Sequence, residues 1–243
     1  MKKGRNIIGR KIEHFKEVDS TNDVAKKLAK DGAAEGTVVI ADVQKKGRGR
    51  YGRSWSSPPA GIWLSVILRP DTSSERVSLL PLIAGSAVAN TLNGLYGLDS
   101  HVRWPNDVLI GDKKAAGILT ELDAGGNFVV VGIGINANID LNDLPAEVRE
   151  TATTLKTELG EEVSKTALIN HLFSEFEVMY DLFNSGSAVI NSSTVNKRVK
   201  VVTKERELTG IAKEIDETGA LILQLEDGSV ERIISGDCIH LST

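Results

Sequence analysis

The chain has 243 residues, a formal net charge of −4 and 41% hydrophobic residues, which is typical of a globular protein with one large domain or one domain and a small companion. A single cysteine excludes an internal disulfide, the four histidines and this cysteine lack zinc-ligand spacing, and the acidic balance argues against a surface that binds nucleic acid throughout. No apolar run approaches the length of about 18 residues that spans a bilayer, and the N-terminus lacks the apolar core of a signal peptide, so we expect a cytoplasmic protein without membrane contact.

The first predicted element is a helix that begins after Ser20 and ends at Gly32. Ser20 and Asp23 have the spacing of a capping box, and a glycine suits the left-handed end of a helix. The short β-branched run 36–41 then predicts a strand, and residues 61–69 predict another.

Residues 75–97 show a mostly buried helical pattern with Pro81 near its start. Three strand-like runs follow, at 107–110, 113–123 and 127–136. Their connections are too short for parallel strands, which need a crossover of about a dozen residues. We therefore predict antiparallel hairpins and an α+β fold with a mixed, largely antiparallel sheet.

Ser164 opens another predicted helix, whose apolar stripe extends to Phe183. The stretch 184–194 is poor in large apolar groups and predicts a linker. Four short strands with Gly/Asp turns come after it and predict a small SH3-like β-barrel. We therefore expect a large domain over residues 1–190 and a C-terminal β domain over residues 191–243.

A basic, glycine-rich stretch at 45–53 stands out in an otherwise acidic chain. Glycines let backbone N–H groups turn toward an anion and arginines add bidentate donors, so phosphate or nucleotide binding is the physical interpretation. Gly47, Gly49 and Gly52 have the spelling of a dinucleotide fingerprint, but that motif needs a helix directly afterwards, and a strand is predicted here. A solvated charged loop remains the alternative.

Five segments together carry a resemblance to a known family. They are D-S-T-N at 19–22, G-R-G-R-Y-G-R-S-W at 47–55, W-P-N-D at 104–107, K-K-A-A-G-I-L-T-E at 113–121 and G-I-G-I-N at 132–136. In order and spacing they resemble the signature segments of biotin protein ligases. The resemblance implies a class II synthetase-like catalytic domain that binds biotin and ATP, followed by that family's SH3-like domain.

The resemblance also implies a two-step reaction with ATP and Mg²⁺. The biotin carboxylate attacks the α-phosphorus to give biotinyl-5′-AMP, and a lysine of a biotin carboxyl carrier protein then attacks the mixed anhydride. Both steps concentrate negative charge, so fixed cations and Mg²⁺ matter more than an acid–base pair. The chain resembles the short form without a DNA-binding domain, so we expect no nucleic-acid partner. A homodimer through a free sheet edge is a further hypothesis.

By the same resemblance, three residues carry the chemistry. Lys114 is the main cation, and in an extended strand Lys113 points to the opposite face. Arg50 folds over the adenylate with its loop, although Tyr51 stands where some relatives carry another arginine. Asp107 orients either the acceptor lysine or the Mg²⁺ shell.

Two sets of binding residues follow from the resemblance. The expected biotin-binding residues are Ser20, Thr21, Asn22, Gln44, Gly47, Arg48, Arg50, Lys114, Gly117 and Gly132. The expected ATP-binding residues are Arg50, Arg53, Trp55, Asn106, Lys114 and Asn136; no residue is assigned to a metal. Glycines inside strands mark close approach of a ligand or a β-bulge, so Gly117 and Gly132 suggest a slot for the flat biotin ring system. Helix capping by Ser20 and a core position for Trp55 are the open alternatives.

Three other functions are consistent with parts of the sequence. A lipoate protein ligase shares the fold and chemistry, but lipoate lacks the ureido group that the neutral side chains of Thr21 and Gln44 would recognise. A non-catalytic biotin or nucleotide sensor has no need of Lys114, Arg50 and Asn136 together. A nucleic-acid-binding module rests on the basic loop alone.

Overall fold

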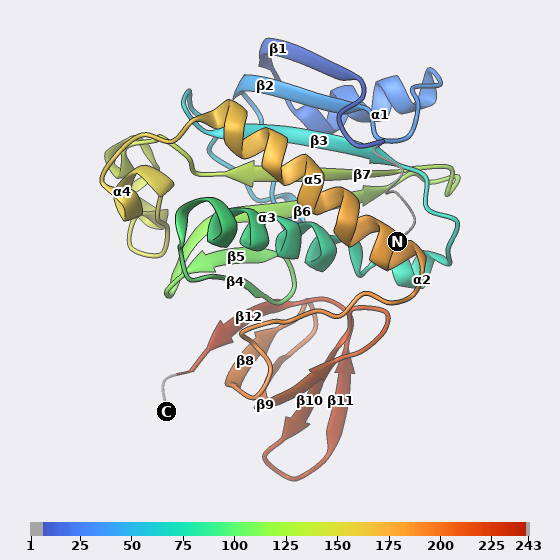
Figure 1. The fold of residues 1–243 in the computed structure, drawn as a ribbon. Helices are drawn as coiled ribbons and strands as arrows, with labels where there is room; N and C mark the ends of the chain where they lie inside the picture. The colour runs from blue at the N-terminus through green and yellow to red at the C-terminus, as the bar shows by residue number, and fades with distance from the viewer. Residues whose placement is uncertain (1–6, 242–243) are drawn as a thin grey trace.

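The computed structural model describes residues 7–241. Residues 1–6 and 242–243 lie outside the described part. They include the ends of the two predicted domains and the start of the N-terminal stretch that was searched for a signal peptide. The described chain forms a seven-stranded sheet with helices and a smaller five-stranded sheet (Figure 1). The predicted α+β class with a C-terminal β domain is confirmed, whereas the domain boundary at residue 190 stays a prediction.

The larger sheet has the strand order β1-β2-β3-β7-β6-β5-β4. Its strands are β1 (Ile12–Val18), β2 (Val38–Gln44), β3 (Ile62–Leu68), β4 (Ser100–Arg103), β5 (Asp107–Ile110), β6 (Lys113–Leu122) and β7 (Val129–Ile135). Only β1 and β2 pair in parallel, and the predicted hairpins β5–β6 and β6–β7 are antiparallel. The edge strands β1 and β4 were not predicted, because their polar side chains hide the usual strand pattern.

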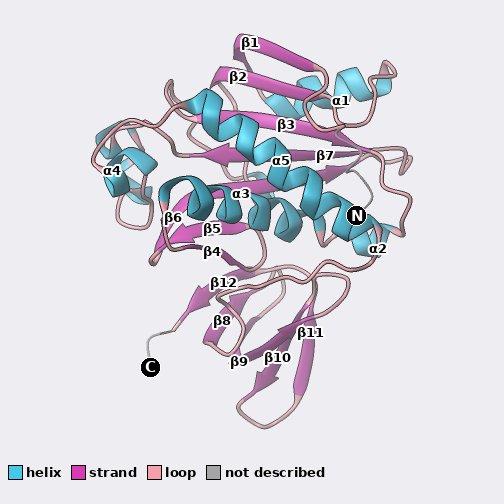
Figure 2. Ribbon diagram, viewed as in Figure 1, coloured by secondary structure: helices cyan, strands magenta, loops and turns pink. Residues whose placement is uncertain are grey.

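Helices lie on both faces of this sheet (Figure 2). They are α1 (Thr21–Lys30), α2 (Ser74–Val77), α3 (Leu80–Tyr96), α4 (Leu155–Leu159) and α5 (Lys165–Asn184), with short 3₁₀ turns η1 (Arg50–Gly52), η2 (Leu141–Asp143) and η3 (Ala146–Val148). The long helices α3 and α5 pack on each other and on one face, where they close the main hydrophobic core. The short helix α1 packs on the other face against β2, β3 and β7. The predicted helix 75–97 is broken into α2 and α3, and Pro81 lies in the first turn of α3.

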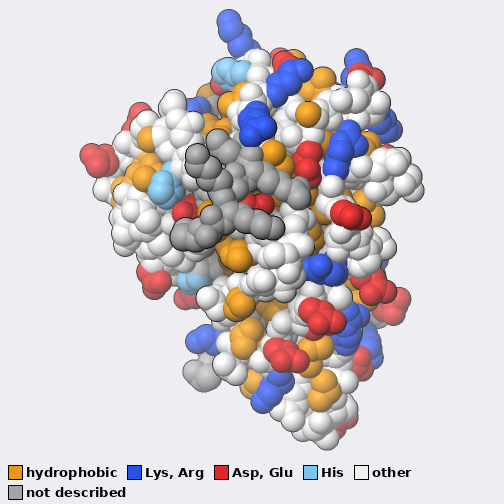
Figure 3. Space-filling model, turned by 45° about the vertical axis from the view of Figure 1, so that its right-hand side comes forward, with side chains coloured by type: hydrophobic (Ala, Val, Ile, Leu, Met, Phe, Trp, Pro, Cys, Tyr) orange, Lys and Arg blue, Asp and Glu red, His pale blue; other side chains and the backbone are white. Residues whose placement is uncertain are grey.

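The segment Ser74–Tyr96 is long and apolar enough to cross a membrane, contrary to our expectation from the sequence. In the structure 72% of its most apolar window is buried inside the protein. Its apolarity therefore serves the core between the sheet and α5. On the face drawn in Figure 3, charged side chains of both signs are interspersed with hydrophobic ones.

The C-terminal sheet has the order β11-β10-β9-β8-β12. Its strands are β8 (Arg198–Val202), β9 (Glu207–Ile215), β10 (Leu221–Leu225), β11 (Val230–Ile233) and β12 (Asp237–His240). The sequence predicted four of these strands. The fifth, β12, pairs antiparallel with β8 and was missed because it is short and polar.

Trp104 anchors the C-terminal sheet to the large domain. Its indole N–H donates to the Gly219 carbonyl oxygen at 2.9 Å, and its backbone N–H donates to Thr194 Oγ1 at 3.0 Å. Trp104 is 1% exposed, so these bonds are made without competition from water. The W-P-N-D segment therefore fixes where the C-terminal sheet lies.

Gly219 tests this contact. Its φ of +88° is left-handed, and a Cβ there would lie 3.1 Å from Leu79 Cα and Ser78 O across the boundary. We expect Gly219→Ala to lower the free energy of unfolding by the left-handed backbone cost of about 1–2 kcal/mol plus about 1 kcal/mol from crowding, measured by chemical denaturation. Gly228→Ala is the matched control, because its φ is +86° and nothing lies within 4 Å. Equal losses in the two variants would show that the boundary is not tightly packed there.

Candidate active site

The floor of the candidate site is one row of residues across the sheet. Ala41, Trp63, Gly134, Gly117 and Asp107 are in register on the consecutive strands β2, β3, β7, β6 and β5. Residues in register share a face of the sheet, and this is the α1 face. The two glycines therefore leave a hollow between Trp63 and Asp107.

Gly117 and Gly132 lie in the paired strands β6 and β7 and both line the cavity, but they are not directly opposite each other, and the slot for biotin stays a prediction. Gly117 faces Gly134 and not Gly132, which pairs with Leu119 and Ser65. A Cβ at Gly132 would lie 2.3 Å from Asn22 Oδ1, so this glycine makes room for a side chain of α1.

Trp55 fills the hollow above the other two glycines. A Cβ would lie 2.9 Å from its ring at Gly117 and 2.7 Å from its Nε1 at Gly134. Its ring meets Trp63 edge-on at 6.5 Å, and the Lys114 ammonium lies 5.1 Å from its centroid. Its indole N–H is buried without a hydrogen-bond partner. Trp55 is thus a wall of the cavity and not part of the main core.

A charge cluster of Arg103, Asp107 and Lys114 borders the hollow. The Asp107 carboxylate accepts a hydrogen bond from Arg103 Nη2 at 2.7 Å and pairs with Lys114 Nζ through its other oxygen. Burial alone would raise the pKa of Asp107, but Lys114 and then Arg103 outweigh it and hold the pKa below its usual value. Two cations around one carboxylate leave a net positive charge facing the cavity. This net positive charge favours the binding of an anion in the cavity.

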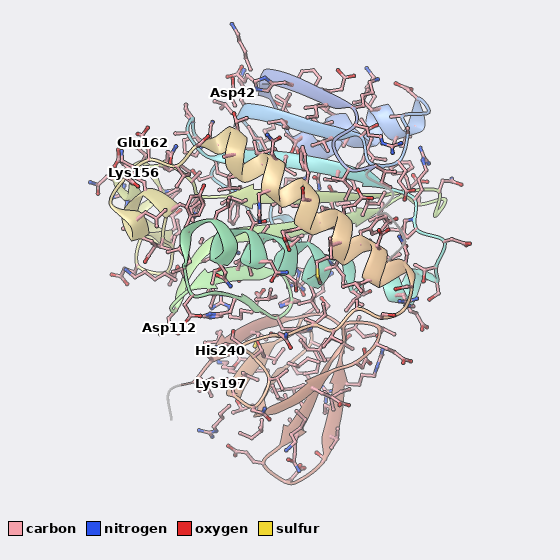
Figure 4. All side chains as sticks on the ribbon, in the orientation of Figure 1. Asp42, Asp112, Lys156, Glu162, Lys197 and His240 are labelled. Atoms are coloured by element: carbon pink, nitrogen blue, oxygen red, sulfur yellow. The ribbon has the colours of Figure 1, made fainter. Side chains whose placement is uncertain are left out.

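Charged side chains of both signs continue along the boundary between the sheets. Figure 4 shows Asp112, in the turn after β5, above His240 of β12 and Lys197, which directly precedes β8. Burial, followed by the charges of Arg103, His101 and Lys197, lowers the pKa of His240, so its imidazole is neutral near pH 7. Asp112 opposes this shift, so the neutral form of His240 depends first on burial and then on the nearby positive charge.

Residues 45–53, named here the arginine loop, are held by the C-terminal sheet. Arg50 donates to the Gly236 carbonyl and to Ser235 Oγ, each at 3.0 Å, and Arg53 donates to both Asp237 oxygens at 2.7 Å. Tyr51 has a left-handed φ of 57°, which brings its hydroxyl 2.6 Å from Ser235 Oγ. The unusual Tyr51 thus reinforces the same contact.

The other end of the arginine loop is held by α1. Arg48 makes two hydrogen bonds of 2.6 Å to the Asp23 carboxylate and lies 3.4 Å from Glu121. The bond with Asp23 raises the pKa of Arg48, and the bond from Arg48 lowers the pKa of Asp23. Arg48 lines the cavity, but its charge is already paired with a protein carboxylate.

A neutral polar recess lies where α1 meets β2. Gln44 Oε1 accepts from the Thr21 backbone N–H at 2.9 Å and from the Thr21 hydroxyl at 3.0 Å, and its amide nitrogen donates to Ser57 Oγ at 2.9 Å. Ser20 occupies the N-cap position of α1, but its side chain makes no cap hydrogen bond, so the predicted capping box is wrong. The Ser20 hydroxyl is therefore not committed to the helix.

Asn106 and Asn136 hold backbone at the rim of the cavity. Asn106 donates to the Ile118 carbonyl at 2.8 Å and accepts from Arg50 at 3.3 Å. Asn136 is 4% exposed and donates to the Thr153 carbonyl at 3.0 Å. Both amides therefore have structural partners in this structure.

One cavity of about 1110 Å³ is lined by every residue predicted for the site. Arg103 and Asp237 also line it and are not among those predictions. Arg103 faces Asp107 across the β4–β5 hairpin, so recognition of W-P-N-D as a hairpin turn would have indicated it. No local signal points to Asp237, which comes from the other sheet. Among residues 7–241 no group of three or more His, Cys, Asp or Glu side chains could hold a metal.

Comparison with known proteins covers both sheets. A model of the "Biotin/lipoate A/B protein ligase family" matches residues 14–138, and one of the "Biotin protein ligase C terminal domain" matches residues 194–241. The bifunctional ligase/repressor BirA of Bacillus subtilis is 36% identical, over 95% of this chain and 74% of that protein. The biotin–[acetyl-CoA-carboxylase] ligase of Mycobacterium tuberculosis is 32% identical, over 96% and 90%. The biotin protein ligase of Aquifex aeolicus in complex with biotin and ATP superposes with a TM-score of 0.81 at 28% identity, over 96% of this chain and 100% of that one.

The contact between the arginine loop and Asp237 predicts a measurable change in loop mobility. Asp237→Asn removes the charge that Arg53 contacts, so trypsin should cleave within residues 45–53 faster, by up to about fivefold, because an exposed ion pair contributes at most about 1 kcal/mol. Glu226→Gln is the matched control, since Glu226 forms an exposed pair with Arg198 far from the loop. Unchanged cleavage after Asp237→Asn would mean that the pair does not restrain the loop.

Proposed function

This chain belongs to the biotin/lipoate A/B protein ligase family and is a biotin protein ligase, and we propose that it forms biotinyl-5′-AMP from biotin and ATP and transfers biotin to a lysine of a biotin carboxyl carrier protein. The observation that carries the proposal is the pairing of two unlike sites in one cavity. A positively charged cluster around Lys114 suits phosphate, and a neutral polar recess around Thr21 and Gln44 suits the ureido ring of biotin.

In the adenylation step, negative charge grows on the oxygens around the α-phosphorus. The Lys114 ammonium is held by Asp107 before any ligand binds, so it stabilises that charge without reorganising in the transition state. The lowered pKa of Asp107 keeps it ionised at neutral pH. It therefore acts as a positioning residue for Lys114 and not as a general acid.

Mg²⁺ would enter with the phosphates of ATP. Proteins usually hold this ion through one or two carboxylates together with substrate phosphates and water. Four carboxylates line the cavity, those of Asp107, Asp112, Glu147 and Asp237. Asp107, in the charge cluster, fits that pattern, and the ion would neutralise charge that Lys114 and Arg103 do not reach.

The arginine loop would serve as the lid of the site. Arg50 and Arg53 offer bidentate donors beside the charge cluster, and Trp55 offers a flat face for adenine. A loop held over the adenylate excludes water from a labile anhydride. In this proposal Arg48 fixes one end of the lid to α1, and Asp237 restrains the other.

The C-terminal sheet contributes Asp237, Cys238 and Ile239 to the lining of the cavity. An acceptor lysine would therefore reach the mixed anhydride beside this sheet.

A cytoplasmic location stays a prediction. A homodimer through a sheet edge also stays a prediction. Among the described residues the edge strand β1 is free, but the charged side chains on and beside it oppose edge-to-edge pairing; they are Lys11, Glu13, Lys16 and Glu17.

The proposal is tested by exchange of labelled pyrophosphate into ATP, with biotin and lipoate as parallel substrates. We expect exchange with biotin and none with lipoate, because the neutral recess offers partners for a ureido group and lipoate has none. Transfer is tested by labelling of a purified carrier protein. Exchange with lipoate alone would make the chain a lipoate ligase, and exchange with neither would refute adenylation of both acids.

Lys114→Ala should slow biotin-dependent exchange by about 10²–10³-fold, the effect of removing one preorganised donor from a developing negative charge. Lys113→Ala is the matched control: the neighbouring side chain is exposed and points away from the cavity, so its rate should not change. A wild-type rate in the Lys114 variant would exclude this ammonium from the chemistry.

A further inference from the structure

Ser65 is a polar residue in an otherwise apolar strand. The β3 sequence is Ile-Trp-Leu-Ser-Val-Ile-Leu, every residue of it is buried, and Ser65 itself is 0% exposed. Burying a hydroxyl costs free energy unless it is hydrogen-bonded. Its Oγ lies 2.6 Å from Asn22 Oδ1 and 2.7 Å from Thr21 Oγ1. Both partners lie at the start of α1 and line the cavity, whereas Ser65 lies beneath them.

Glu121 fixes which end of the Asn22 amide faces Ser65. Asn22 Nδ2 donates to the Glu121 carboxylate at 2.6 Å, and Lys26 also donates to this carboxylate at 2.5 Å. An ionised carboxylate only accepts hydrogen bonds, so the amide nitrogen must face it. The Asn22 oxygen therefore faces Ser65 as an acceptor.

Gln44 is fixed in the same way from the other side. A backbone N–H can only donate, so the bond from Thr21 N requires Gln44 Oε1 at that position. The Gln44 amide nitrogen consequently faces Ser57 and retains a second N–H. Gln44 offers the cavity a donor.

These two fixed amides determine the direction of the Thr21 hydroxyl. If Ser65 donates to Asn22, the Thr21 proton goes to Ser65 or to Gln44; if Ser65 donates to Thr21, that proton goes to Gln44. In each of these arrangements the Thr21 proton is bonded inside the protein, to Ser65 or to Gln44. The Thr21 oxygen then presents a lone pair, and no proton, to the cavity.

We propose that Ser65, oriented through Asn22 by Glu121, is a positioning residue that makes Thr21 an acceptor and so selects a cyclic urea. A urea presents N–H donors beside a carbonyl acceptor, which matches an accepting Thr21 beside a donating Gln44. A dithiolane offers neither group. This inference rests on the proposed function, since it names how biotin would be distinguished from lipoate at the recess.

The test is the KM for biotin in pyrophosphate exchange by the full chain. Ser65→Ala leaves a buried acceptor without its donor and frees the Thr21 side chain, so KM for biotin should rise about tenfold. The rate at saturating biotin and the KM for ATP should stay at wild-type values, because the charge cluster is untouched. The ratio of the KM for a biotin analogue methylated at a ureido nitrogen to the KM for biotin should be smaller in this variant than in the wild type.

Three further variants separate this role from simple packing. Ser65→Thr and Ser65→Val have the same shape, so crowding affects both, but only the threonine keeps the hydroxyl and should restore a low KM. Glu121→Gln no longer enforces the orientation of Asn22 and should also raise the KM. Ser100→Ala, the control, removes another buried hydroxyl, which donates to the Ala89 carbonyl at 3.0 Å, and should change stability without changing the KM.

The outcomes are distinguishable. A wild-type chain that shows no biotin-dependent exchange refutes the proposed function itself. Normal exchange by the wild type, with equal KM values for Ser65→Thr and Ser65→Val or an unchanged KM for Ser65→Ala, overturns the role of Ser65 alone. A parallel rise in the KM for ATP would also overturn it, because that is the pattern of a general loss of structure.

Discussion

Two neighbouring positions of the central strands, Gly117 and Gly134, carry no side chain on the cavity face, and the position of the Trp55 wall depends on that absence. A sheet of seven strands normally buries both faces under helices or leaves one to water. Here α3 and α5 cover one face with apolar packing, while α1 covers only part of the other. Gly117 and Gly134 lie next to each other where α1 ends its cover. Glycine weakens a strand interior. The two glycines therefore lower the stability of the sheet at the place where the Trp55 ring needs room.

Around that space, polar side chains are oriented by carboxylates, which can only accept hydrogen bonds. The Asp107 carboxylate holds Lys114 with help from Arg103, and the Glu121 carboxylate holds the Asn22 amide. An acceptor-only group beside an amide fixes which end of that amide faces it. Preorganisation of this kind lowers the cost of binding because the side chains lose little further freedom when a ligand arrives.

The sequence predicts the parts of this structure that depend on near neighbours. Short connectors required the β5–β6 and β6–β7 hairpins, and the capping side chain of Ser164 marks the start of α5. The motif segments indicated residues that meet at one cavity. The register of Gly117 was not predictable in this way, because it depends on how two strands slide past each other.

Contacts between distant segments were beyond the sequence for a related reason. Asp237 reaches the arginine loop because the C-terminal sheet docks beneath the large domain, where Trp104 is one of the contacts. Ser65 was visible in principle, since a lone hydroxyl inside an apolar strand indicates a buried partner. Identifying that partner needed the position of α1 over β3.

The arginine loop is bonded both to α1, through Arg48, and to the C-terminal sheet, through Arg53. A segment shared by two bodies couples them reciprocally, since binding free energies obey linkage. An anion that draws Arg53 away from Asp237 weakens the contact between the arginine loop and the C-terminal sheet. By the same free energy, that contact weakens the binding of the anion. Loosening of the small domain and occupancy of the cavity by such an anion are therefore linked. Each changes the free energy of the other by the same amount.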